Sequence, residues 1–271
     1  LVRRQCASEL GLVVPPVRVR DNIRLPQDVY VILLKGVEIA RGTIQMGYEL
    51  AMSPGAGALP VEGIETREPV FGLAATWIRP ERRGDAEVAG YTVVEPSAVM
   101  ATHLAETIKA HAEEILGRQE VQAIIDQVKQ RAAAVVEELI PNGLTVGGVQ
   151  KVLQRLLSER ISIRDMVTIL ETLADHAPAT RDVDTLTERV REALGRAITQ
   201  QYRDERGGLA VVSLDPALEQ ELIQALKAGD GGPRIYLPVE ASRQLLEEVS
   251  RAVHQALAQT SQPVILCSPY L

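Results

Sequence analysis

The chain has 271 residues, more than the roughly 100 to 150 residues of a typical domain, so we expect two or more subdomains. Hydrophobic residues make up 46% of the chain and charged residues 24%, a composition typical of folded proteins that argues against a disordered or fibrous one. The formal net charge of −7 gives an average field that repels a phosphate backbone, which argues against nucleic acid as a partner.

The first hundred residues predict a mixture of strands and helices, because short β-prone runs alternate with turn residues. We expect a helix over residues 1–10 and a loop over residues 53–63, which read SPGAGALPVEG. The expected strands cover residues 17–20, 29–34, 37–41, 70–78 and 91–94. The last two strands follow the loop and predict a small β-rich insert.

From Ser97 the apolar residues recur with the period of an α-helix, which predicts helices up to about residue 201. Ser97 is the expected N-cap of the first helix and Gly117 its stop signal. Further helices are expected around the apolar positions within residues 121–128, 149–157, 166–173 and 186–198. Ser162 and Asp165 fit a capping box before the third of these helices.

The last seventy residues return to a pattern of strands and helices. We expect a strand over residues 209–214, followed by a helix with Asp215 as its N-cap, Pro216 at its first position and Gly229 as its end. A second helix is expected over residues 245–257 and a strand over residues 263–267.

No group of residues has the spacing of a catalytic or metal site. His103 and His111 lie on one expected helix about 12 Å apart along its axis, too far to share a metal ion. Cys6 and Cys267 stand at opposite ends of the chain without a CxxC motif, which suits a reducing compartment. The glycines of residues 53–63 lack the P-loop pattern, and no run approaches the roughly 18 to 20 apolar residues of a membrane span. We therefore expect no enzyme activity, no cofactor and no membrane span in this chain.

Phe71 and Trp77 are the only Phe and the only Trp of the chain, and they fall at even spacing in one expected strand. A regular strand would place both on one face, where both could pack in the core. Gly72 can break the alternation and let Phe71 reach the surface while Trp77 stays buried. Both interpretations remain open from the sequence.

Five blocks of sequence, in order and over nearly the whole chain, resemble one known family. They read GLVVPPVRVRDN at 11–22, LLKGVEIARG at 33–42, EPVFGLAATWI at 68–78, GYTVVEPSAVMATHLAETIKAHAEEILGRQ at 90–119 and IRDMVTILETLADHAP at 163–178. These blocks are similar to the cytoplasmic part of the flagellar type III export gate, in the FlhA/InvA-type export gate family.

The resemblance implies a mixed α/β fold of four subdomains. These are a discontinuous thioredoxin-like first subdomain (1–45 and 96–116), a ferredoxin-like insert (46–95), a helical third subdomain (117–201) and an α/β fourth subdomain (202–271). Relative to the family, the membrane-embedded half is missing and the chain stops short of the strand and helix that complete the last subdomain.

The same resemblance implies a docking platform without catalysis, on the cytoplasmic side of the bacterial inner membrane. Its implied partners are flagellar export chaperones carrying late substrates, other components of the export apparatus, and copies of itself in a ring of the full-length protein. The implied docking residues are Glu68, Phe71 and Thr102, with Pro54 as a further lining residue; the family usually has Asp at the position of Glu68. Such a platform would help to order substrate export.

Two alternatives remain beside this interpretation. The cytoplasmic domain of a virulence-type secretion gate shares the ATHL and IRD signatures of residues 101–104 and 163–165. A small-molecule enzyme on the α/β subdomains would need a deep polar pocket with perturbed titratable groups.

Overall fold

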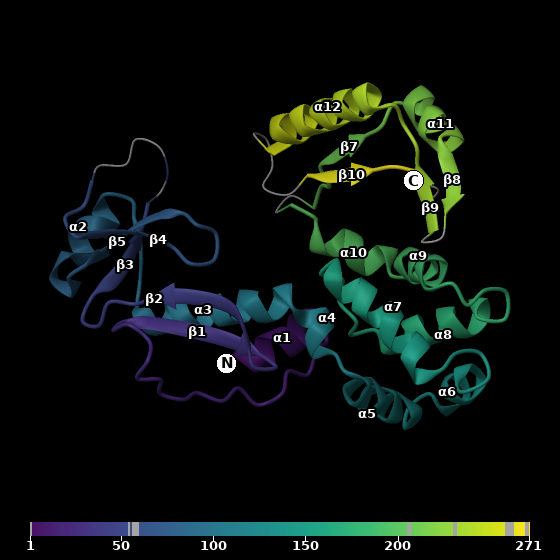
Figure 1. Ribbon diagram of the computed structural model, residues 1–271, viewed down its shortest axis with the longest axis horizontal. Helices are drawn as coiled ribbons and strands as arrows, with labels where there is room; N and C mark the ends of the chain where they lie inside the picture. The colour runs from purple at the N-terminus through teal and green to yellow at the C-terminus, as the bar shows by residue number, and fades with distance from the viewer. Residues whose placement is uncertain are drawn as a thin grey trace. The chain divides into compact units, whose positions relative to one another are not determined.

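A computed structural model describes residues 2–53, 55, 60–204, 207–229, 232–257, 263–268 and 271. The chain divides into two compact units (Figure 1). Unit 1 comprises Leu1–Ala123 and Leu153–Arg164, and unit 2 comprises Ile124–Val152 and Asp165–Leu271. Two helices, α5 (Arg118–Lys129) and α7 (Val146–Ser158), have residues in both units.

The first part of unit 1 is an antiparallel hairpin with helices. Its elements are α1 (Val2–Leu10), β1 (Val29–Leu34), β2 (Val37–Thr43), α3 (Pro96–Ala110) and α4 (Ala112–Ile115). Helix α1 packs on α3, where the Nζ of Lys109 lies 2.6 Å from a Glu9 carboxylate oxygen and 2.8 Å from one of Glu106. Helix α3 begins at Pro96 with Glu95 as its N-cap, two residues before the expected N-cap Ser97.

Two expectations for this part are corrected. Residues 17–20, expected as a strand, pair with no other strand among the described residues, and Val17 and Val19 are exposed. A β-prone sequence forms a strand only where a partner offers hydrogen bonds and a face to cover, and this segment has neither. Within the described residues the sheet of this part has two strands, fewer than a thioredoxin-like sheet implies.

The insert is a four-stranded antiparallel sheet in the order β4-β5-β3-β6. Its strands are β3 (Glu49–Met52), β4 (Ile64–Arg67), β5 (Ala74–Ile78) and β6 (Thr92–Val94), and η1 (Pro80–Arg82) and α2 (Arg83–Val88) connect the last two. All neighbouring strands are antiparallel, as a ferredoxin-like sheet requires, and the ferredoxin-like assignment of the insert remains a prediction.

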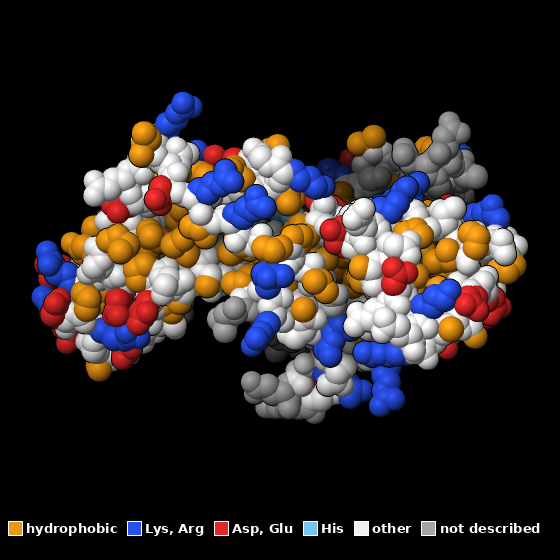
Figure 2. All heavy atoms as spheres, turned by 90° about the horizontal axis from the view of Figure 1, so that it is seen from below, with side chains coloured by type: hydrophobic (Ala, Val, Ile, Leu, Met, Phe, Trp, Pro, Cys, Tyr) orange, Lys and Arg blue, Asp and Glu red, His pale blue; other side chains and the backbone are white. Residues whose placement is uncertain are grey.

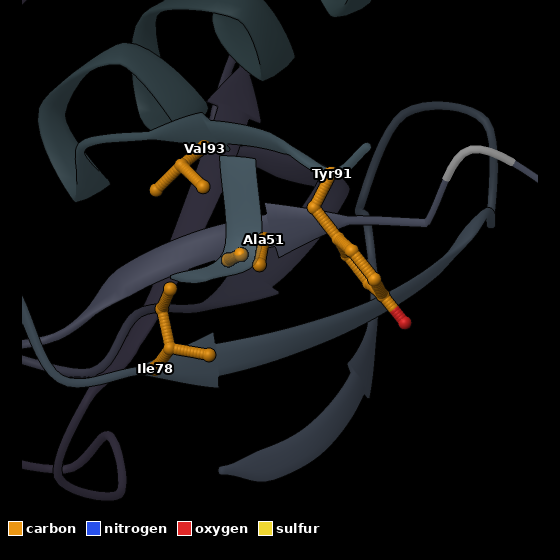
Figure 3. Packing of buried hydrophobic residues seen from close by; sticks show 5 residues of the cluster. Ala51, Ile78, Tyr91 and Val93 are labelled. Atoms are coloured by element: carbon orange, nitrogen blue, oxygen red, sulfur yellow. The ribbon is translucent and has the colours of Figure 1, made fainter. Parts of the chain in front are cut away.

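Alternation along the strands gives the insert two apolar faces. On one face the core consists of Ala51, Ile78, Ala86, Tyr91 and Val93 (Figure 3). On the other face Leu50, Ala75 and Trp77 pack against Val99 of α3. The insert is thereby attached to the helix that carries Thr102 and His103.

The helical region comprises α5, α6 (Ala133–Leu139), α7, α8 (Met166–His176), α9 (Val183–Ala193) and α10 (Gly195–Gln201). Helix α8 packs on α6 and α9. Asp165 and Asp182 cap α8 and α9, since their carboxylates accept hydrogen bonds from the backbone N–H groups of Thr168 and Thr185.

Three local details of this region differ from expectation. The N-cap of α8 is Asp165 and not Ser162, because Ile163 lies outside the helix and its backbone N–H donates to the Leu10 carbonyl at 2.8 Å. The helix expected over residues 186–198 is divided at Leu194 into α9 and α10. Helix α6 was not expected, because the periodic pattern of apolar residues in this segment is too short to predict a helix.

The end of unit 2 combines a parallel strand pair with a hairpin. Strands β7 (Val211–Ser213) and β10 (Val264–Leu266) are parallel, and β8 (Leu226–Gly229) pairs antiparallel with β9 (Gly232–Ile235). Asp215 caps α11 (Pro216–Gln224) as expected, but the helix ends at Gln224 because β8 takes up the next residues. Helix α12 (Val239–Leu257) has 19 residues, and none of the helices in the described ranges is both long and apolar enough to cross a membrane.

Candidate functional site

The connection between β4 and β5, which we name the 68–73 loop, is held by its own hydrogen bonds. The backbone N–H of Glu68 donates to the Leu73 carbonyl at 2.9 Å, and that of Gly72 donates to the Glu68 carbonyl at 3.0 Å. The two carboxylate oxygens of Glu68 accept from the backbone N–H groups of Val70 and Phe71, at 2.8 and 2.7 Å. The loop therefore has a defined shape before any partner arrives.

Phe71 projects from this loop with 69% of its surface exposed, whereas Trp77 on β5 is 2% exposed. Gly72 separates them with a φ of 68°, a left-handed conformation that glycine adopts without strain. The interpretation in which Gly72 breaks the alternation is confirmed, and plain core packing of Phe71 is wrong.

Other apolar side chains are exposed on the same hairpin, among them Leu73 and Ile64. Figure 2 shows hydrophobic side chains gathered at the surface on the left of the view, the side on which Figure 1 places β3, β4 and β5. Phe71 is thus one of several exposed apolar residues on this hairpin.

Glu68 is 6% exposed, so its side chain does not lie at an exposed rim as expected. Both of its oxygens are engaged by the loop's own backbone N–H groups, and charge-assisted bonds of this kind are the strong ones. Its position supports a role in shaping the loop that presents Phe71.

The other implied docking residues lie outside the loop. Thr102 is exposed on α3, one residue before His103. Pro54 lies outside the described residues.

A partly buried group of polar side chains, which we name the Tyr30–His103–Glu68 cluster, was not predicted from the sequence. The Tyr30 hydroxyl lies 2.7 Å from His103 Nδ1, and the two rings meet edge to face with centroids 5.7 Å apart. Burial and then the Glu68 carboxylate raise the pKa of Tyr30 to about 12. Burial lowers the pKa of His103, while the Glu68 carboxylate acts in the opposite direction. His103 was assigned a structural role, and no signal in the sequence connects it to Tyr30, 73 residues away.

Elsewhere on the described surface we looked for metal-binding groups and for hollows. Among the described residues no group of three His, Cys, Asp or Glu side chains could hold a metal ion. A hollow of about 360 Å³ is lined by Asn142, Gly143, Ala177, Pro178, Ala179, Thr180 and Arg181. Another of about 630 Å³ follows one face of α12. Neither contains a residue of the 68–73 loop.

Comparison with known proteins decides the family. The chain matches the FHIPEP family over residues 1–271. It belongs to the FHIPEP family. The flagellar biosynthesis protein FlhA of Bacillus subtilis is 43% identical over 269 residues, and that of Escherichia coli K12 is 44% identical over 265 residues. The alignments cover 99% and 98% of this chain but only 40% and 38% of the relatives, so the chain spans about two fifths of their length.

Solved structures agree with this assignment. The Chlamydia pneumoniae CdsV protein is similar with a TM-score of 0.77 and 27% identity, over 97% of this chain and 83% of that one. The same protein in complex with CdsO gives a TM-score of 0.77 at 25% identity, over 92% of this chain and 72% of that one. The nonameric EPEC SctV-C shares the fold, with a TM-score of 0.74 at 22% identity and coverage of 97% and 86%. The resemblance to an export gate family is therefore confirmed, as is a mixed α/β fold.

Proposed function

We propose that the chain is the cytoplasmic docking platform of a flagellar type III protein export gate. It would bind complexes of export chaperones with their substrates and help to order substrate export. The observation that carries this proposal is the exposed aromatic ring of Phe71 on a loop whose shape is fixed by Glu68.

The geometry of the loop suits a docking anchor for two reasons. A large aromatic side chain supplies most of the burial when a partner covers it, and such residues dominate binding energies at interfaces. A loop that is already ordered loses less conformational entropy on binding than a flexible one. The hydroxyl of Thr102 would add a polar contact at the edge of this surface, and Pro54 remains a proposed lining residue.

The flagellar version of the gate is favoured over the virulence-type version by sequence identity. The flagellar biosynthesis relatives are 43% and 44% identical to this chain, against 27% for CdsV and 22% for SctV-C. Nothing in the described residues favours the small-molecule enzyme.

Partners beyond the chaperones follow from the relatives by analogy. SctV-C is described as nonameric, and CdsV has been solved in complex with CdsO. We extend both to this chain as proposals: a ring of copies, and contact with another component of the export apparatus. The platform would lie at the cytoplasmic side of the inner membrane, attached through the additional length that the curated relatives possess.

A calorimetric titration with a flagellar chaperone tests the proposal. The chain is titrated with the chaperone loaded with its late substrate and, as a control, with the same chaperone unloaded. We expect clear binding of the loaded complex and much weaker binding of the unloaded chaperone. Equal affinity for both, or no binding of either, would contradict the docking role.

A further inference from the structure

Ten consecutive residues between α1 and β1, PPVRVRDNIR at 15–24, are all exposed, and we name them the 15–24 segment. Within it Val19 is 91% exposed and Ile23 is 100% exposed. The segment forms neither a helix nor a strand, as the trace between α1 and β1 in Figure 1 shows. Apolar side chains exposed together in this way mark an interaction surface more often than single exposed residues do.

The 15–24 segment is held in place at both ends. Before it, Leu12 and Val14 are buried, and the Val14 carbonyl accepts a hydrogen bond from Arg3 Nε at 2.7 Å. At its other end the backbone N–H of Leu25 donates to the Asn22 carbonyl at 3.1 Å, in a turn that leads towards β1. A segment that is already anchored loses less conformational entropy on binding than a free one.

Between these ends the backbone is unpaired. No hydrogen bond joins a backbone N–H or C=O group of residues 15–21 to any other residue that the structure describes. The φ angle is negative at each of these residues, and Pro15 and Pro16 favour an extended backbone. The backbone groups of residues 17–21 are therefore available to a strand that adds alongside, as they are at the free edge of a sheet.

Charged and apolar side chains alternate along the same stretch. An extended backbone places Arg18 and Arg20 on one side, and Val17 and Val19 on the other. Neither arginine forms an ion pair with a described residue. The ten residues contain three arginines and one aspartate in a chain with a net charge of −7, so the segment is a basic site on an acidic protein.

We propose that residues 17–21 bind an extended acidic segment of a protein partner by β-strand addition. Acidic side chains of the partner lie opposite Arg18 and Arg20, and its apolar side chains lie opposite Val17 and Val19. Cross-strand pairs of both kinds stabilise a pair of strands, and the backbone hydrogen bonds supply affinity. This surface goes beyond the proposed function, because it shares no residue with the 68–73 loop.

The sequence pattern disfavours two other occupants. A second copy of the segment that sets valine opposite valine also sets arginine opposite arginine, and like charges directly opposite each other destabilise a strand pair. A nucleic acid or an anionic membrane meets the repulsive average field of the chain. Neither of these makes use of the alternation of Val and Arg or of the open backbone groups.

The test uses a labelled synthetic peptide in which Glu alternates with Val, and measures binding by fluorescence anisotropy. One control peptide has the same composition with its Glu residues grouped together, and another is methylated on its inner backbone N–H groups. We expect the alternating peptide to bind at least about tenfold more tightly than either control. Absence of binding at about 1 mM, or equal binding of the grouped peptide, overturns the inference.

Hydrogen exchange locates the bound peptide on the chain. Backbone N–H groups of residues 17–21 that gain acceptors on the added strand should exchange more slowly when the alternating peptide is present. Exchange that stays unchanged over residues 15–24 at saturating peptide overturns the inference.

Charge reversal supplies the matched variants. Arg18→Glu combined with Arg20→Glu should weaken binding of the Glu–Val peptide at least about tenfold and create binding of a peptide in which Lys alternates with Val. Arg196→Glu combined with Arg251→Glu is the control, since both arginines are exposed, on α10 and α12, and the net charge changes equally. An equal loss in this control means that overall charge attracts the peptide, which overturns the inference.

Two further measurements separate this surface from the alternatives. Vesicles containing phosphatidylglycerol should not bind the chain through Arg18 and Arg20; vesicle binding that their reversal abolishes, without binding of the peptide, assigns the segment to a membrane and overturns the inference. Phe71→Ala should bind the alternating peptide as the wild-type chain does, whatever its affinity for a chaperone. Loss of peptide binding in that variant contradicts a separate surface.

Discussion

The carboxylate of Glu68 is buried, yet it determines the shape of an exposed loop by accepting two backbone hydrogen bonds. An Asp or Glu side chain that bonds to backbone N–H groups two and three residues on has this effect wherever the chain turns. The family resemblance drew attention to Glu68, but the burial of its side chain could not be predicted. Burial depends on packing in the folded chain, where the Glu68 carboxylate acts electrostatically on the pKa values of Tyr30 and His103, two residues distant in sequence.

Glu68→Ala should lower both stability and docking affinity. The substitution leaves the N–H groups of Val70 and Phe71 without their acceptor, which we expect to lower the free energy of unfolding by about 1 to 3 kcal/mol. Glu68→Asp keeps a carboxylate that can reach the same N–H groups and should recover most of the loss. Urea denaturation together with chaperone titration measures both effects, and an Ala variant with full stability would contradict the loop-shaping role.

Thr102→Ala, unlike Glu68→Ala, should affect docking without lowering stability. Thr102 is exposed on α3, so its replacement should change the free energy of unfolding by no more than about 0.5 kcal/mol. If its hydroxyl contacts the partner, docking weakens by about 0.5 to 1.5 kcal/mol. Thermal melting and the same titration separate the two quantities, and unchanged affinity would remove Thr102 from the proposed surface.

At the scale of elements, local patterns predicted most helices and the strands that pair with near neighbours. The cap at Asp215 and the helical period of α7 are encoded in a few adjacent residues. The predictions were wrong where a segment distant in sequence determines the local structure. Residues 17–20 have β propensity but no partner strand, and the bond from Ile163 to Leu10 keeps Ser162 outside α8.

Leu153→Ala tests the scaffold role of the helical region. Leu153 is fully buried on α7, so the cavity left by its replacement should cost about 2 to 5 kcal/mol of the free energy of unfolding. Lys151→Ala, at an exposed position of the same helix, is the control and should change stability by no more than about 0.5 kcal/mol. Loss of chaperone binding in a Leu153→Ala protein of normal melting temperature would contradict a purely structural role.

At the scale of the whole molecule, the mixed α/β fold class could be predicted because five sequence blocks carry the resemblance along the chain. The division into two compact units could not be predicted, because α5 and α7 each contribute residues to both. The order of the insert's sheet likewise depends on pairings between strands that are not consecutive in the chain. The proposed subdomain boundaries remain predictions.

We expect this 271-residue chain to be mostly monomeric in dilute solution, although we propose a ring for the longer protein. The weak lateral contacts of a ring are strengthened when attachment raises the local concentration of the subunits, and an isolated chain lacks that effect. Sedimentation velocity at micromolar concentration measures the state directly. A tight ring under these conditions would contradict the expectation.

The most direct test of docking at Phe71 is one variant measured in two ways. Phe71→Ala should weaken the affinity for a loaded chaperone by about 2 kcal/mol, roughly thirtyfold, and leave the melting temperature unchanged. Leu246→Ala is the control, since Leu246 on α12 is also 69% exposed but lies outside the loop, and it should change neither quantity. Full affinity of a folded Phe71→Ala protein, or a melting temperature lowered as for a core residue, would contradict the proposed docking site.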